Sequence, residues 1–83
     1  MSIDVNTTLH DLFEIAKFNM KDLKSGEIFI VKELFKGYEW NRISKRNRTK
    51  LGSMIYEHVN SKACSDISPL GKTPQNQQKY EKL

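Results

Sequence analysis

The stretch Glu27–Phe35, EIFIVKELF, decides the predicted fold, because the spacing of its apolar residues changes halfway along it. Glu27–Ile30 is short and rich in β-branched and aromatic residues, which predicts a single strand. From Val31 onwards the apolar residues recur at the spacing of one helix face, and Gly37 is a suitable C-terminal stop. We therefore expect a strand followed directly by a short second helix.

A longer helix is predicted on each side of this stretch. The Thr8 hydroxyl can cap the first helix, which ends at the Lys24–Gly26 turn, and Ser44 is the best cap for the third. Gly52 lies within the third helix, where a glycine can let a neighbouring element or a ligand backbone come close, and packing of a neighbour is the expected reason. The apolar stripes are Leu9, Leu12, Phe13, Ala16 and Met20 in the first helix and Leu51, Met54, Ile55 and Val59 in the third.

The C-terminal segment is polar and is interrupted by two prolines. Residues 66–70 can form a strand, residues 71–76 a loop and residues 77–83 a returning strand; the alternative is a mobile tail. Tyr80 could fold back onto the core. The order helix, strand, helix, helix, hairpin is that of a winged helix-turn-helix. We therefore expect an α+β, mainly α fold with three helices, a short strand and a C-terminal β-hairpin wing.

The length of 83 residues allows a single domain, residues 1–83, in which residues 1–7 are expected to be a loose N-terminus. Cys64 is the only cysteine, and His10 and His58 are far apart, so we expect no disulfide, no metal site and no cofactor. The start of the chain lacks the features of a signal peptide, and no apolar run reaches membrane length. We expect a cytoplasmic protein that does not bind membranes.

One short motif resembles an enzyme signature. Gly71-Lys72-Thr73 looks like the end of a phosphate-binding P-loop, but that motif needs a glycine where Asp66 stands. No pairing of Ser or Cys with His suggests an activated nucleophile, and no paired carboxylates suggest acid–base chemistry. The sequence therefore predicts a protein that is not an enzyme and has no small-molecule substrate.

Basic residues are concentrated in the second half of the chain. Residues 1–39 carry five Lys or Arg against seven Asp or Glu, a net −2, and residues 40–83 carry nine against three, a net +6. The run Trp40–Tyr56 has no acidic residue, and its basic residues are Arg42, Lys45, Arg46, Arg48 and Lys50. Charge of one sign attracts phosphate, so this run predicts a nucleic-acid surface. The alternative is a solvated helix face.

Two aromatic residues, Tyr38 and Trp40, stand at the start of the basic run and could stack on unpaired bases, although Trp40 could instead belong to the core. In a winged helix the wing lies beside the third helix, which adds polar and cationic candidates from the hairpin. The predicted nucleic-acid interface comprises Tyr38, Trp40, Arg42, Lys45, Arg46, Arg48, Lys50, Lys72, Gln75 and Lys79.

Several short motifs are similar to those of a known family. They are Gly26–Phe29, Lys32–Phe35, Gly37–Arg42, Leu51-Gly52 and Gly71–Tyr80, within a similarity that covers roughly residues 9–82. They resemble a small "domain of unknown function" family, whose members are short stand-alone proteins on staphylococcal cassette chromosomes and other Gram-positive mobile elements. The resemblance implies a winged-helix protein that binds single-stranded DNA and is encoded beside replication genes of the element.

Three hypotheses of function remain. The first is a protein that binds single-stranded DNA with little sequence specificity, in replication or transfer of a mobile genetic element. The second is a duplex-DNA transcriptional regulator, and the third is an adaptor subunit of a DNA polymerase or helicase. Aromatics beside cations favour the first. We therefore expect single-stranded DNA as the main partner, with replication proteins such as a polymerase or helicase as further partners.

Overall fold

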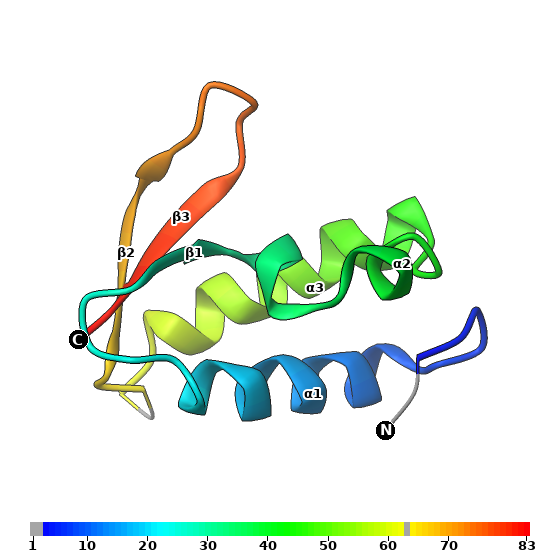
Figure 1. The fold of residues 1–83 in the computed structure, drawn as a ribbon, viewed down its shortest axis with the longest axis horizontal. Coiled ribbons are helices and arrows are strands. Elements are labelled where there is room, and N and C mark those ends of the chain that lie inside the picture. Colours follow the sequence, from blue (N-terminus) through cyan, green and yellow to red (C-terminus); the bar gives the residue numbers. More distant parts are fainter. Residues whose placement is uncertain (1–2, 63) are drawn as a thin grey trace.

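The computed structural model describes residues 3–62 and 64–83, which form three helices and one three-stranded antiparallel sheet, a small α+β arrangement (Figure 1). The elements in chain order are α1 (Leu9–Lys21), β1 (Ile28–Ile30), a 3₁₀ turn (Val31–Leu34), α2 (Gly37–Trp40), α3 (Lys45–Val59), β2 (Ile67–Lys72) and β3 (Gln78–Lys82). Within these residues, no helix is both long enough and apolar enough to cross a membrane.

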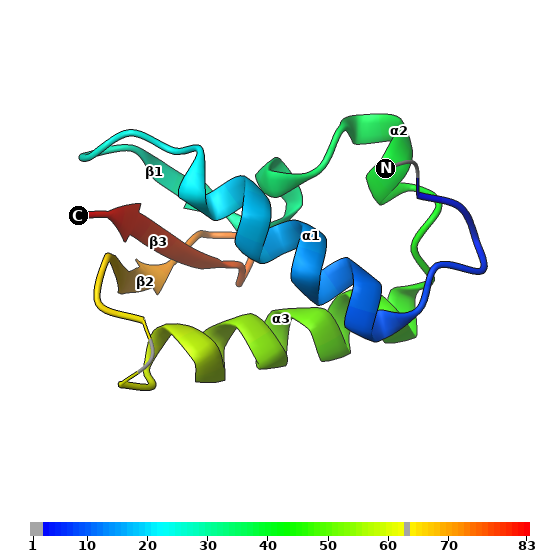
Figure 2. The same cartoon turned by 90° about the horizontal axis from the view of Figure 1, so that it is seen from below.

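The two long helices begin at the predicted caps. The Thr8 hydroxyl accepts the backbone N–H of Asp11 at 3.2 Å, and the Ser44 hydroxyl accepts the backbone N–H of Asn47 at 3.2 Å. Each hydroxyl satisfies a backbone donor that has no partner within its helix. Figure 2 shows α1 and α3 side by side, with the strands at one end. Their facing stripes are buried at Leu12, Ala16, Met20, Leu51, Ile55 and Val59.

The prediction of a short second helix from Val31 is confirmed only as one 3₁₀ turn, and its predicted stop at Gly37 is wrong. Val31–Leu34 is a 3₁₀ turn, Phe35 is extended, and α2 begins at Gly37 rather than ending there. The side-chain amide of Asn19 donates to the Leu34 carbonyl at 2.7 Å, so α1 satisfies a carbonyl that a continuing helix would have used. Gly37 does not have the positive φ of a glycine stop, whereas Gly26 does, at 93°.

The predicted C-terminal hairpin is present. β2 and β3 pair antiparallel, and β3 also pairs with β1, which gives the order β1-β3-β2. β3 is therefore the central strand, and Tyr80 stands opposite Phe29 in its register. Pro69 lies in β2, an edge strand, where its missing N–H leaves no bond unmade within the sheet. Tyr80 is fully buried, as the sequence suggested, and joins the strands to the helical core.

The N-terminal segment is held against the fold over the residues that the structure describes. Ile3 is buried in the core, and its carbonyl accepts a hydrogen bond from Nη1 of Arg42 at 2.7 Å. The Thr7 hydroxyl accepts the backbone N–H of Asp4 at 2.9 Å, which closes a turn before α1. Residues 1–7 are predicted to be a loose N-terminus; of these, Ile3 supplies apolar area to the small core, and residues 1–2 lie outside the described part.

Candidate nucleic-acid interface

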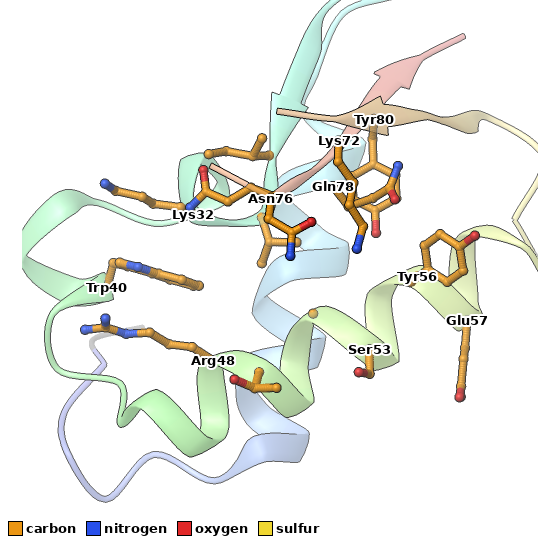
Figure 3. Close-up of a pocket in the computed structure, with 15 residues that line it drawn as sticks. Lys32, Trp40, Arg48, Ser53, Tyr56, Glu57, Lys72, Asn76, Gln78 and Tyr80 are labelled. Carbon is orange, nitrogen blue, oxygen red and sulfur yellow. The ribbon is translucent and has the colours of Figure 1, made fainter. Parts of the chain in front are cut away.

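A hollow of about 800 Å³ lies between α3 and the β2–β3 hairpin (Figure 3). One wall is a face of α3, and the other is the hairpin with its connecting loop. Trp40 of α2 and the 3₁₀ turn close one end. The lining includes Trp40, Arg48, Gly52, Tyr56, Gln78 and Tyr80.

The helical period explains which side chains α3 presents to the hollow. Arg48, Gly52 and Tyr56 are four residues apart and therefore share one face. The buried stripe of α3 occupies an adjacent face and holds this one in place. A Cβ at Gly52 would meet no atom within 4 Å, so the expected close packing of a neighbour is wrong. Gly52 instead widens the hollow, because a side chain at this position would project into it.

Trp40 and Arg48 form one packed unit at the end of the hollow. The guanidinium carbon of Arg48 lies 5.3 Å from the centroid of the Trp40 ring, within the range of a cation–π contact. The Phe35 ring lies 5.7 Å from the same indole. Figure 3 shows the guanidinium and the indole one above the other. Trp40 therefore packs against the core and also lines the hollow.

Tyr38 and Arg42 lie outside the residues that line the hollow. The guanidinium carbon of Arg42 is 5.1 Å from the centroid of the Tyr38 ring, and its Nη1 is bonded to the Ile3 carbonyl. Tyr38 is 56% exposed. This pair lies beside the N-terminal segment, so the structure gives Arg42 an internal contact that the sequence did not predict.

The remaining cations of α3 divide between two faces. Lys45 does not itself line the hollow, but it is three residues before Arg48 and seven before Gly52, so it continues the row of side chains that does. Arg46 and Lys50 are one turn apart and face away from the buried stripe, and the side chains of Lys45, Arg46 and Lys50 are all exposed. In the described parts of the chain, the ion pairs are Glu14–Lys17 and Asp66–Lys82. The cations of α3 are therefore not neutralised by a carboxylate of the described chain.

The hairpin also divides the predicted residues between two faces. Lys72 lines the hollow, together with Gln78. Gln75 and Lys79 instead line a separate depression of about 370 Å³ beside β1. Alternate side chains of a strand point to opposite faces, and Tyr80 faces the helices, so Lys79 must face away from them. The structure thus brings Trp40, Arg48 and Lys72 together and places Gln75 and Lys79 elsewhere.

Sequence reasoning missed several residues of the hollow. Tyr56, which is 46% exposed, lies one helical turn beyond Gly52 and two turns beyond Arg48. This spacing would have allowed its prediction from the sequence. Ser53 carries no comparable signal. Tyr80 was predicted only as a core residue, but it also lines the hollow, and its hydroxyl is buried with no hydrogen-bond partner among the described residues.

Two polar atoms in the lining are buried without a partner in the described structure, the hydroxyl of Tyr80 and Nε of Arg48. Burial raises the pKa of Tyr80 to about 12, with a smaller effect from Tyr56, so its hydroxyl is a protonated donor at neutral pH. Among residues 3–62 and 64–83, no group of three or more His, Cys, Asp or Glu is placed to hold a metal ion. The arrangement suits a ligand with aromatic faces, acceptors and negative charge.

Comparison with known proteins gives one finding. The model of the family described as "Domain of unknown function (DUF1413)" matches residues 14–82, which include all the described secondary structure from the middle of α1 onwards. No curated protein and no solved structure matches the chain.

Proposed function

This chain belongs to the DUF1413 family, a domain of unknown function, and from that premise we propose that it is a non-enzymatic protein that binds single-stranded DNA with little sequence specificity. The hollow between α3 and the hairpin carries the proposal, because aromatic, cationic and amide side chains line one concave surface. The resemblance of its motifs adds a setting to the proposal, replication or transfer of a mobile genetic element beside a polymerase or helicase.

We also propose that the fold is a variant of the winged helix. The order of the elements and the sheet order β1-β3-β2 support this assignment, with α3 as the recognition helix and β2–β3 as the wing. The second helix departs from that pattern, since it is split into a 3₁₀ turn and the four-residue α2.

The lining favours unpaired bases over a duplex. Single strands expose base faces, and stacking on an aromatic side chain contributes about 1–3 kcal/mol per base. The guanidinium of Arg48 over the Trp40 indole and the exposed ring of Tyr56 offer two such platforms. Lys72 and Lys45 can contact the phosphates between stacked bases, because neither forms an ion pair within the described chain.

A duplex-DNA regulator is the second candidate. The outer face of α3 carries Arg46 and Lys50, both exposed and both outside the lining of the hollow. A helix that enters a major groove would present that outer face to the DNA. The two candidates therefore differ in which side of α3 contacts DNA, and this difference can be measured.

The test uses single- and double-stranded oligonucleotides of equal length and two double variants that remove equal charge. Lys45→Ala with Lys72→Ala removes two cations from the side of the hollow, and Arg46→Ala with Lys50→Ala removes two from the outer face. We expect tighter binding to single strands in a fluorescence anisotropy titration, with affinity falling roughly 3- to 10-fold in the first variant and less in the second.

Both variants should melt at nearly the temperature of the native sequence, because exposed cations contribute little to stability. Tighter binding to the duplex, with the larger fall in affinity in the Arg46/Lys50 variant, would reject the proposal in favour of the groove-reading regulator. Absence of binding to either form of DNA would reject both candidates.

A further inference from the structure

The Tyr80 hydroxyl is a hydrogen-bond donor whose position the core determines. The Tyr80 ring stacks on Phe29 of the neighbouring strand, with ring centroids 5.6 Å apart and 27° between the planes. The residue is 0% exposed, yet it lines the hollow beside α3. Its hydroxyl has no partner among the described residues. A buried polar group without a partner costs about 1–3 kcal/mol, so an acceptor from a ligand would remove that cost.

Uncharged and cationic side chains surround this hydroxyl. Tyr56 and Gln78 are uncharged and lie nearest to Tyr80, and the Lys72 side chain lies at the same end of the hollow (Figure 3). Nε2 of Gln78 donates to the backbone carbonyl of Lys79 at 3.0 Å, so the side-chain carbonyl oxygen of Gln78 is left as an acceptor. Glu57 lines the hollow from α3, and its side chain points away from Tyr80 (Figure 3). Lys72 is exposed and can contact a phosphate that stays in solvent, whereas burying a phosphate at the recessed Tyr80 hydroxyl would carry a large desolvation cost.

We propose that this end of the hollow receives one base of a bound single strand, and that the Tyr80 hydroxyl donates a hydrogen bond to a carbonyl oxygen of that base. The inference rests on the proposed function, because the base enters as part of the bound strand. Because the hydroxyl is buried, a neighbouring side chain must move for the base to reach it, and exposed side chains such as Tyr56, which also lines the hollow, change rotamer within nanoseconds.

This geometry has a consequence for base preference. Thymine, cytosine and guanine carry a carbonyl oxygen that projects from the ring, whereas the acceptors of adenine are ring nitrogens. A recessed donor reaches a projecting oxygen better than an atom within the ring. The protein should therefore bind adenine-rich strands less tightly, although it reads no sequence elsewhere. A tyrosine hydroxyl is protonated at physiological pH, and burial raises the pKa of Tyr80 further.

The experiment compares two purine bases of the same size, adenine and hypoxanthine, of which only hypoxanthine has a carbonyl group. A single strand of about 12 nucleotides, rich in adenine, is titrated beside the same strand with every adenine replaced by hypoxanthine, which carries a carbonyl where adenine carries an amino group. We expect the full chain to bind the hypoxanthine strand about 3- to 10-fold more tightly, the range that one net hydrogen bond supplies. Tyr80→Phe should abolish that preference and keep the affinity for the adenine strand.

The variant keeps the ring and removes only the hydroxyl. Its melting temperature should equal or exceed that of the native chain, because an unpaired buried polar group is removed without a change of shape. Binding of both strands by the native chain without the preference, or a preference that survives in Tyr80→Phe, would overturn this inference and leave the proposed function standing. Failure of the native chain to bind either strand would remove the proposed function and this inference together.

Discussion

Arg42 and Arg48 both belong to the basic run, and the structure gives each of them a contact within the protein. Arg42 bonds to the Ile3 carbonyl and lies over Tyr38, whereas Arg48 lies over Trp40 at the end of the hollow. Arg46, between them, is exposed and forms no ion pair within the described residues. Neighbouring residues of one charge therefore have different roles, because their side chains leave the backbone in different directions.

Substitution of these arginines should separate stability from binding. Arg42→Ala should lower the free energy of unfolding by about 1–2 kcal/mol, since it removes a charged hydrogen bond that holds the N-terminal segment. Arg46→Ala should change it by less than about 0.5 kcal/mol. Urea denaturation of the two variants measures this difference. Equal stability of both would show that the Ile3 contact is not maintained in solution.

At the scale of elements, the hollow depends on α3 having no side chain at Gly52. The glycine lies within the helix, where it costs up to about 1 kcal/mol relative to alanine, and no atom lies within 4 Å of an added Cβ. Helix propensity therefore favours alanine at this position, whereas an open hollow favours glycine.

Two substitutions at Gly52 test this conflict. Gly52→Ala should raise the melting temperature by a few degrees, because the helix gains propensity and the methyl group meets no neighbour. Gly52→Leu should also fold, but its side chain should occupy the hollow and weaken single-stranded DNA binding by roughly tenfold or more. Unchanged affinity in the folded Gly52→Leu protein would show that DNA does not enter between α3 and the hairpin.

At the scale of the whole molecule, charge is divided between the two halves of the chain. The first 39 residues carry a net −2 and the remainder +6, and the cations of α3 and Lys72 form no ion pairs within the described residues. The basic surface formed by α3 and Lys72 attracts a polyanion, and added salt shortens the range of this attraction.

Binding of single-stranded DNA should therefore depend on salt in a predictable way. With about 3–5 phosphates neutralised, log K should fall against log salt with a slope of about −2 to −3.5. The Lys45/Lys72 double variant should flatten this slope by about 1.4, or 0.7 for each phosphate that it no longer neutralises. Gly52→Leu should weaken binding without flattening the slope, because steric exclusion releases no counterions. Titrations at several salt concentrations measure both slopes, and a flat native slope would contradict the phosphate contacts.

The sequence by itself determined the elements that depend on near neighbours. The caps at Thr8 and Ser44 act over three residues, and the apolar stripes of α1 and α3 follow from the helical period. The hairpin pairs strands that are close in the chain, so its polar turn residues were sufficient to predict it. The basic run was also evident from the sequence, because the positions of charged residues can be read from it directly.

Only the tertiary structure decided which of these residues meet. The Leu34 carbonyl is bonded by Asn19, 15 residues away, at the point where the local pattern favoured a continuing helix. Trp40 meets Arg48, and Tyr80 reaches the hollow from the central strand, through packing between separate elements. Such contacts depend on how whole elements pack, and residue spacing carries no record of that packing, so the candidate site emerges only when the helices and the hairpin are assembled.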